Sequence, residues 1–258
     1  MMDLKTLTLK IEDGVAVVTL NRPPVNAQNA ELRGELVQVF DTLSETDEVA
    51  AIVITGSGKT FSAGADIRER SGMADAPGAY GRHNRLVREC YYAMVECSKP
   101  IIAAINGPAL GAGFGLVMGA DIWVAAEEAY VSMPEINVGL AGGVTFLQKH
   151  FSHSRARRMF YTGMQVPAQE LYRLGLVEAC LPAAELMPYA MGIAREIASK
   201  SPIAVRLAKE AARFTLAMPP REAYRYEQGN TFALSKTEDS KEAQRAFLEK
   251  RKPVYVGR

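Results

Sequence analysis

Short apolar strands alternate with amphipathic helices along the first part of this chain, and that alternation restricts the fold more than any other feature. Residues 7–11 and 15–20 are rich in β-branched side chains and flank Asp13-Gly14, a dipeptide typical of two-residue hairpins. A helix is predicted next from four apolar residues at spacings of three and four: Leu32, Leu36, Phe40 and Leu43. This order favours an α/β core.

The same alternation continues to about residue 150 and then gives way to helices. Residues 51–55 and 101–105 are predicted to be buried strands, a helix is predicted over residues 80–95, and the aperiodic residues 71–78 predict a mobile loop. From Ser154 onward the pattern is almost entirely helical. We therefore divide the chain into an α/β core, residues 1–195, and a helical C-terminal region, residues 196–258.

Two details of the helical part are open to test. One apolar helix face begins near Leu186 and includes Pro188, which we expect to lie in the first turn, where a proline is tolerated. Helices are also predicted over residues 221–234 and 239–248, the second preceded by Thr237 as N-cap.

Composition excludes several classes of protein. The 258 residues suffice for one large domain, and the formal net charge of +1 creates no overall field for nucleic acid or an anionic membrane. Three scattered cysteines and three histidines show neither a disulfide framework nor a metal-ligand spacing. With no signal peptide in view and no apolar run of roughly 18 residues, we expect a cytoplasmic protein without membrane, nucleic-acid or metal partners.

Two glycine motifs are misleading. Residues 56–60 (Gly-Ser-Gly-Lys-Thr) resemble the end of a phosphate-binding loop, but the full motif needs a glycine where Val53 stands. Residues 111–113 (Gly-Ala-Gly) would need a third glycine at Leu116 to form a dinucleotide fingerprint. Neither a nucleotide triphosphatase nor a dinucleotide-binding protein is predicted.

Two other segments, residues 61–66 and 107–115, each follow a buried strand and are rich in Gly and Ala. Small residues let a ligand approach the backbone, where two N–H groups that converge on one oxygen form an oxyanion hole. Small residues serve close packing equally well. Spacing alone leaves both interpretations open.

Several motifs in register resemble the enoyl-CoA hydratase/isomerase (crotonase) family. They lie at residues 21–23 (Asn-Arg-Pro), 61–66, 100–115, 134–136 (Pro-Glu-Ile) and 246–253. The resemblance implies a crotonase-like spiral of β-β-α units and acyl-CoA thioester substrates bound by the core. It also implies a homotrimer or dimer of trimers, in which the C-terminal helices assemble the subunits and cover the active site.

The resemblance also assigns residues to coenzyme A and to the thioester. Ala65 and Ala112 match the positions whose N–H groups hold the thioester oxygen, and Ala63 matches a position beside the adenine. The remaining expected coenzyme A contacts are Lys59, Asp66, Arg68 and, from a neighbouring subunit, Phe247 and Lys250. Coenzyme A is expected as part of the substrate, with no separate cofactor.

Glu135 matches a catalytic Glu of the family, and Gly115 stands where many hydratases carry a second one. Pro134 fixes the chain before Glu135, and Ile136 and Val138 predict an apolar wall beside it. One carboxylate suffices to move a proton from one carbon to another. The missing group therefore favours double-bond isomerisation, while hydration by a single Glu stays open.

Two further alternatives remain. The 3-hydroxyacyl-CoA hydrolases of the family resemble residues 113–116, but they carry an Asp shortly after the later Glu, and residues 139–143 contain none. A non-catalytic crotonase-fold scaffold is the other alternative. An RNA-binding form of it lacks support, because Arg155, Arg157 and Arg158 form only one short basic cluster.

Overall fold

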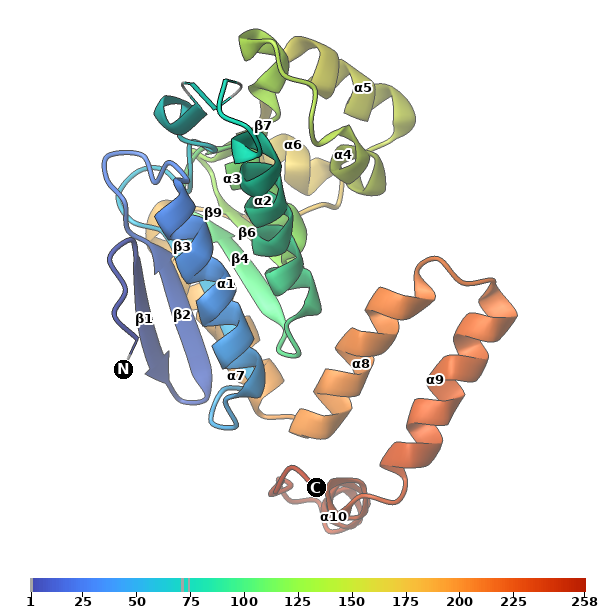
Figure 1. The fold of residues 1–258 in the computed structure, drawn as a ribbon. Coiled ribbons are helices and arrows are strands. Elements are labelled where there is room, and N and C mark those ends of the chain that lie inside the picture. The colour runs from blue at the N-terminus through green and yellow to red at the C-terminus, as the bar shows by residue number, and fades with distance from the viewer. Residues whose placement is uncertain (1, 71, 74) are drawn as a thin grey trace.

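A six-stranded sheet forms the centre of the protein, shown in Figure 1 as a computed structural model that describes residues 2–70, 72–73 and 75–258. β1 and β2 are antiparallel and the other neighbours are parallel. In spatial order the strands are β1 (Leu7–Glu12), β2 (Val15–Leu20), β3 (Ala51–Gly56), β4 (Ile101–Ile105), β6 (Ile122–Ala126) and β9 (Cys180–Leu181). Every residue of β3 and β4 is buried, because helices cover both faces of a parallel sheet.

A smaller sheet takes one short strand from successive turns of the chain: β5 (Ala109–Leu110), β7 (Tyr130–Ser132) and β8 (Val166–Pro167). β5 follows β4 and precedes α3 (Ala112–Gly119), while β7 follows β6 and precedes the 3₁₀ helix η2 (Pro134–Val138). Each repeat of the chain therefore contributes one strand to the large sheet and one to the small sheet, and a helix follows. The expected α/β spiral of β-β-α units is confirmed.

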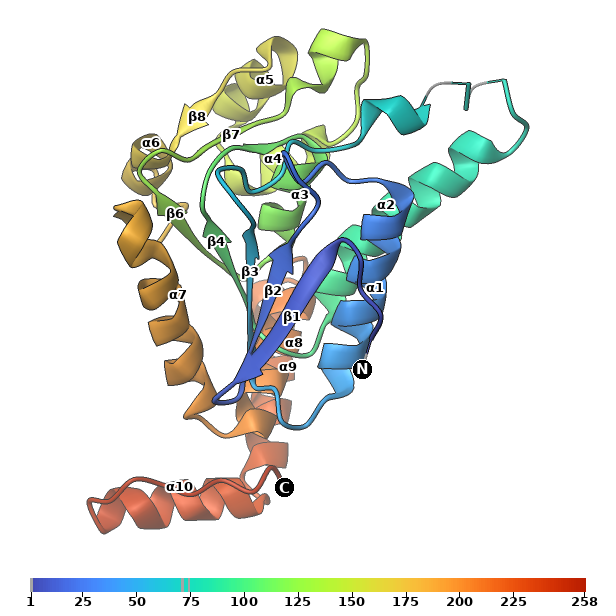
Figure 2. The ribbon, with the colours of Figure 1, turned by 90° about the vertical axis from the view of Figure 1, so that its left-hand side faces the viewer.

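Helices lie on both faces of the large sheet (Figure 2). α1 (Ala30–Glu45) and α2 (Ala79–Glu96) pack against each other on one face, and α7 (Ala183–Ala198) packs on the other against β2, β3, β4 and β6. The apolar stripe predicted for α1 is buried in the core: Leu32, Leu36, Phe40 and Leu43. That stripe holds α1 on the sheet.

The C-terminal helices form an arm that leaves the sheet (Figures 1 and 2). α8 and α9 pack against each other, and α9 leads back to α10, which lies at the end of the molecule opposite α4 and α5. The remaining helices are η1 (Ile67–Arg70), α4 (Val144–His150), α5 (His153–Thr162), α6 (Ala168–Arg173), α8 (Pro202–Thr215), α9 (Pro220–Leu234) and α10 (Glu238–Leu248). Along the described part of the chain, none of the helices is long and apolar enough to cross a bilayer. The division of the chain at residue 195 stays a prediction. In the structure, α7 passes through that residue and ends at Ala198.

Helix ends follow local chemistry where capping residues are present. Thr237 Oγ1 accepts a hydrogen bond from Ser240 N–H at 3.1 Å, which confirms the predicted N-cap of α10. The prediction for Pro188 is wrong: α7 begins at Ala183, so the proline is the sixth residue and lies in the second turn. The helix starts earlier than its apolar face because residues 183–185 (Ala-Ala-Glu) are themselves good helix formers.

The region predicted to be almost entirely helical also contains β8 and β9. Each has two residues, too few to display a strand period. The loop predicted over residues 71–78 includes Ser71 and Ala74, which lie outside the described residues.

Hydrogen bonds of Asn26 connect the turn before α1 to the loop after β3. Its backbone φ of 52° is a left-handed conformation that Asn adopts more readily than most residues. Its buried amide nitrogen donates to the carbonyl oxygens of Ser57, Thr60 and Phe61 at 3.0, 2.8 and 3.2 Å. Ser62 Oγ donates in turn to Asn26 O at 2.7 Å. These bonds position the start of the first Gly/Ala-rich segment.

Candidate active site

A cavity of about 450 Å³ lies between α2, α3 and the chain that follows β7. Gly111, Ala112 and Gly115 line it from the second Gly/Ala-rich segment, and Glu135 lines it from η2. Gln28, which precedes α1, contributes to the same wall. Residues distant in the sequence therefore meet in one pocket of a size that suits a small molecule.

Glu135 places its carboxylate against the backbone at Gly111. A Cβ atom built on Gly111 would lie 2.5 Å from Glu135 Oε1. Gly111 has a φ of 52°, so both its conformation and this approach require glycine. Among the carboxylates of the described residues, that of Glu135 alone lines the cavity. It is the carboxylate placed to accept or donate a proton there.

The direction of the Ala65 N–H follows from a parallel bridge between Gln28 and Ala65. Gln28 N–H donates to Gly64 O at 2.7 Å, and Asp66 N–H donates to Gln28 O at 3.0 Å. The residue between two such bonds directs its own N–H to the opposite side. Within the described residues, the Ala65 N–H donates to no acceptor, so it is available to a ligand.

Ala112 supplies a second available N–H because it is the first residue of α3. The N–H groups of a first helical turn have no partner inside the helix and carry its positive dipole end. In the part of the chain that the structure describes, the Ala112 N–H donates no hydrogen bond.

The two loops that carry these donors are joined directly. Leu110 N–H donates to Ser62 O at 2.9 Å, and a Cβ built on Gly64 would lie 3.3 Å from Ala112 N. Ala65 and Ala112 therefore belong to adjacent, mutually packed segments. Ala112 lines the cavity together with Glu135, whereas Ala65 lies outside the lining, in the segment packed against Ala112. Two such N–H donors near one carboxylate can stabilise an oxyanion while a proton is moved next to it.

Gly115 leaves room in the cavity. A Cβ built on it would meet no atom within 4 Å, although the residue lies in α3 and lines the pocket. A side chain at this position would project into open space. Lack of space therefore does not explain why residue 115 carries no carboxylate.

The wall beside Glu135 differs from the prediction. Ile136 and Val138 are 39% and 53% exposed and do not line the cavity. Met133, Leu140 and Phe146 line it instead. Successive side chains of a 3₁₀ helix point about 120° apart, so the residue after Glu135 is directed elsewhere.

Gln28 and the part of the wall that α2 provides, which includes His83 and Tyr91, were not predicted from the sequence. These residues fall in a turn and on a helix with no motif. Only the fold brings them to the pocket.

The coenzyme A residues expected near the loops lie outside the lining of this cavity, and their roles stay predictions. Lys59 and Arg68 are exposed, and the half-buried Ala63 donates its N–H to Val25 O at 2.9 Å. Asp66 is held by Arg22, with Nη2 2.9 Å from Oδ2. Burial raises the pKa of Asp66, but the Arg68 N–H and the Arg22 guanidinium outweigh it and hold that pKa below its ordinary value.

Phe247 lies in the last turn of α10 and Lys250 follows the helix, and α10 lies far from α2 and α3, which line the cavity (Figure 2). Phe247 is 82% exposed. The structure does not bring these two residues to Glu135 within one subunit, and their expected role in a neighbouring subunit stays a prediction.

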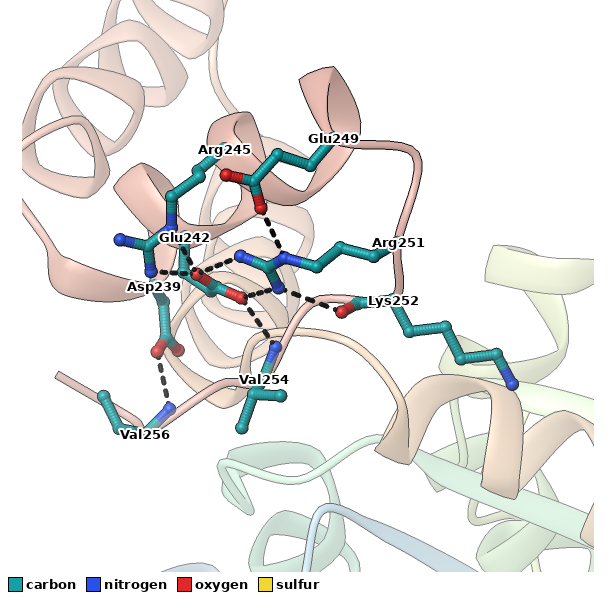
Figure 3. A network of polar contacts seen from close by, with 8 residues as sticks. All are labelled: Asp239, Glu242, Arg245, Glu249, Arg251, Lys252, Val254 and Val256. Atoms are coloured by element: carbon teal, nitrogen blue, oxygen red, sulfur yellow. Dashed lines mark hydrogen bonds and ion pairs between the residues drawn. The ribbon is translucent and has the colours of Figure 1, made fainter.

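Buried carboxylates hold the C-terminal tail on α10 (Figure 3). Asp239 accepts from Val256 N–H at 2.8 Å, and Glu242 accepts from Val254 N–H at 3.1 Å and from Arg251 Nη1 at 2.5 Å. Hydrogen bonds from Arg251 and then from Arg245 hold the pKa of Glu242 far below its usual range. The network fixes the C-terminal tail against α10.

Among the described residues, one thiol lines the cavity, and it is buried. Cys90 lines the cavity, but burial raises the pKa of its thiol to about 12, which suppresses the nucleophilic thiolate. Across residues 2–70, 72–73 and 75–258, no group of three or more His, Cys, Asp or Glu side chains is placed to hold a metal ion.

The spiral and the pocket define a crotonase-fold enzyme. A model of the enoyl-CoA hydratase/isomerase family matches residues 10–258, and the chain belongs to that family.

Known proteins of similar sequence and structure agree with this assignment. The chain is 36% identical over 256 residues to the short-chain-enoyl-CoA hydratase of Clostridium acetobutylicum, covering 97% of each chain. It is 34% identical to the (7aS)-7a-methyl-1,5-dioxo-2,3,5,6,7,7a-hexahydro-1H-indene-carboxyl-CoA hydrolase of Rhodococcus jostii, covering 93% of each. The crystal structure of an enoyl-CoA hydratase from Bacillus anthracis superposes with a TM-score of 0.93 at 33% identity, covering 98% of this chain and 100% of that one. The relatives are named as enzymes, so the scaffold alternative loses its support.

Replacing Gly111 and Gly115 by alanine, one at a time, should distinguish the glycine that positions Glu135 from the glycine that only leaves space in the cavity. In Gly111→Ala the new methyl group would meet Glu135 Oε1 in a strained backbone, so we expect a loss of about 1–3 kcal/mol in unfolding free energy. Displacement of the carboxylate should also lower turnover by roughly 100-fold. Gly115→Ala should keep its stability or gain up to about 1 kcal/mol, because alanine favours the helix. Denaturant titration and enoyl-CoA assays measure both, and equal losses in the two variants would contradict the geometry.

Proposed function

We propose that this enzyme moves a double bond in an enoyl-CoA thioester by carrying one proton between two carbons on Glu135. The observation that supports this most is the single carboxylate that lines the cavity with the Ala112 donor, next to the packed segment that carries Ala65, where Gly115 supplies no second carboxylate. Isomerisation is the family reaction for which that set of groups suffices.

The chemistry follows from where charge develops. Glu135 removes a proton from the carbon next to the thioester, and the electron pair moves toward the thioester oxygen to form a conjugated enolate. The Ala65 and Ala112 N–H groups stabilise that oxygen, each by roughly 3 kcal/mol in a preorganised site. Protonated Glu135 then returns the proton to the far end of the conjugated system. The electron pair shifts back, and the double bond ends beside the thioester.

Hydration of a 2-enoyl-CoA is the second candidate, favoured by the name of the Clostridium relative. It requires water to be held and activated by Glu135 without a carboxylate at residue 115. A 3-hydroxyacyl-CoA hydrolase is less well supported, since no Asp of the described residues lines the cavity beside Glu135.

Coenzyme A enters this reaction as part of the substrate, and acid–base chemistry on the acyl group needs no separate cofactor. Lys59, Ala63, Asp66 and Arg68 are the residues we expect to meet it from the same chain. Cys90, Cys97 and Cys180 are free thiols. They suit a reducing compartment, so we propose a cytoplasmic location.

Assembly into a homotrimer or a dimer of trimers would use the C-terminal arm and bring Phe247 and Lys250 to a neighbouring cavity. Apolar side chains are concentrated on its solvent-exposed surface, at 63–82% exposure: Tyr224, Phe232, Phe247, Leu248 and Val254. A monomer rarely leaves such a set uncovered.

Replacing Glu135 by Gln should remove the proton carrier while keeping the shape of the pocket. We expect turnover to fall at least about 100-fold, while binding of a saturated acyl-CoA changes by less than about threefold. Separate incubations with 2-enoyl-CoA and 3-enoyl-CoA, resolved by mass and retention, identify the reaction, because only hydration adds the mass of water. Glu128→Gln, an exposed change nearby in sequence, is the control. Full activity in Glu135→Gln would reject the mechanism.

A carboxylate restored at residue 115 should shift the balance between the two reactions. Gly115→Glu projects into open space and can share with Glu135 the task of holding water. We expect its ratio of hydration to isomerisation to rise by about tenfold or more. Gly115→Gln, of the same size but uncharged, should leave the ratio near that of wild type. An equal rise in both variants would show that size and not charge is responsible.

The arm can be tested through its most exposed aromatic residue. Phe247→Glu places a charge on the proposed interface and should convert the assembly to monomers in sedimentation velocity at micromolar protein concentration. The Michaelis constant for acyl-CoA should rise as the neighbour's Lys250 is lost. Ile11→Glu, the same kind of change on the half-exposed strand β1, is the control. An unchanged assembly in Phe247→Glu would contradict the proposed role of the arm.

A further inference from the structure

Gln28 lies in the wall of the cavity, and the proposed mechanism gives its side chain no task. The residue is 2% exposed, and both of its backbone polar groups are used in the bridge to the loop at residues 64–66. This pairing therefore fixes the backbone of Gln28 beside Ala65. A long polar side chain in such a place needs a reason, because a leucine or methionine would fill the same volume with no polar atom to satisfy.

The amide nitrogen of Gln28 is the informative atom. It is buried, and in the described part of the chain it donates no hydrogen bond. A buried amide without a partner destabilises the folded protein. When that amide belongs to the wall of a cavity, a bound ligand can supply the missing acceptor, and a few such polar groups are what orient ligands in largely apolar pockets.

The acceptor must be an oxygen that the mechanism leaves unassigned. In the proposed mechanism the N–H groups of Ala65 and Ala112 bind the thioester oxygen, and Glu135 transfers the proton. A side-chain NH₂ group complements a carbonyl, hydroxyl or carboxylate oxygen. The lining supports a polar substituent as well, since α2 contributes Asn84 and Tyr91 to it. A plain hydrocarbon chain would gain nothing from these groups and would leave the Gln28 amide unpaired.

We propose that Gln28 determines specificity, donating a hydrogen bond to an oxygen substituent on the acyl group of the CoA thioester, separate from the thioester oxygen. The substrate class is then an oxygenated acyl-CoA in preference to a plain fatty acyl-CoA. This inference rests on the proposed function, because it requires an acyl-CoA in the cavity. A site that hydrogen-bonds one substrate group discriminates strongly against the analogue without it, since the buried polar atom is then left unpaired.

Binding of unreactive saturated thioesters tests the proposal without involving catalysis. The probes are hexanoyl-CoA and its keto, hydroxy and terminal-carboxylate derivatives of the same chain length, with dissociation constants measured by titration calorimetry. Wild type should bind at least one derivative about tenfold or more tightly than hexanoyl-CoA. In Gln28→Leu that ratio should fall to about one, while the affinity for hexanoyl-CoA stays the same or rises. Gln28→Met repeats the test with an unbranched side chain should the Leu variant fail to fold.

Gln38→Leu makes the same replacement on the exposed side of α1 and should keep the wild-type ratio. The proposal is overturned if wild type shows no preference for any derivative, or if the preference survives in the folded Gln28 variants. The second result would indicate that water satisfies the amide in every complex. Failure of wild type to bind any of the thioesters would instead reject the proposed function itself, so the two failures are distinguishable.

Discussion

The parallel pairing between Gln28 and the loop at residues 64–66 is the interaction on which the site depends. Its two backbone bonds, of 2.7 and 3.0 Å, turn the Ala65 N–H away from the pairing segment, where it meets no acceptor among the described residues. Asn26 anchors the preceding turn to the same loop through its buried amide. Because main-chain geometry sets the direction of the donor, residue 65 needs no functional side chain. A small one that lets the thioester approach is enough, and the same holds for Ala112 at the start of α3.

Some glycines of the second Gly/Ala-rich segment serve close packing and others serve the site. Spacing alone had left both interpretations open. A Cβ on Gly107 or Gly113 would overlap the carbonyl oxygen of Lys59 or Ser62, so these two positions serve close packing of the loops. Gly111 gives space to the Glu135 carboxylate, and Gly115 opens onto the cavity. Packing and catalysis both require a missing Cβ, and therefore no pattern of small residues could tell them apart. The identity of the facing atom decides, and that atom belongs to another part of the chain.

Sequence reasoning succeeded where a local period carried the information. The stripe of α1 was predicted from the spacing of its apolar residues, and the strands β2, β3 and β4 were predicted from apolar runs within their own residues. The strands β5, β8 and β9 were not, since a two-residue strand exists only through a partner distant in the sequence. Gln28 was missed for the same reason: it lies between two asparagines that form turns and caps, and its pairing partner is the distant loop at residues 64–66. The roles given to Glu135, Ala65 and Ala112 came from resemblance, and the structure adds the placement that makes those roles physically reasonable.

A single carboxylate also simplifies the electrostatics of the site. When Glu135 takes the proton it becomes neutral, and the negative charge moves to the thioester oxygen in front of the two N–H donors and the positive end of α3. The total charge of the pocket is unchanged, so no additional cation is needed during the step. A second carboxylate at residue 115 would stay negative beside the enolate and raise its energy unless water or a hydrogen bond screened it. Gly115 thus removes a repulsion as well as a functional group, and a neutral donor such as Gln28 can hold an acyl oxygen in the same pocket without restoring that repulsion.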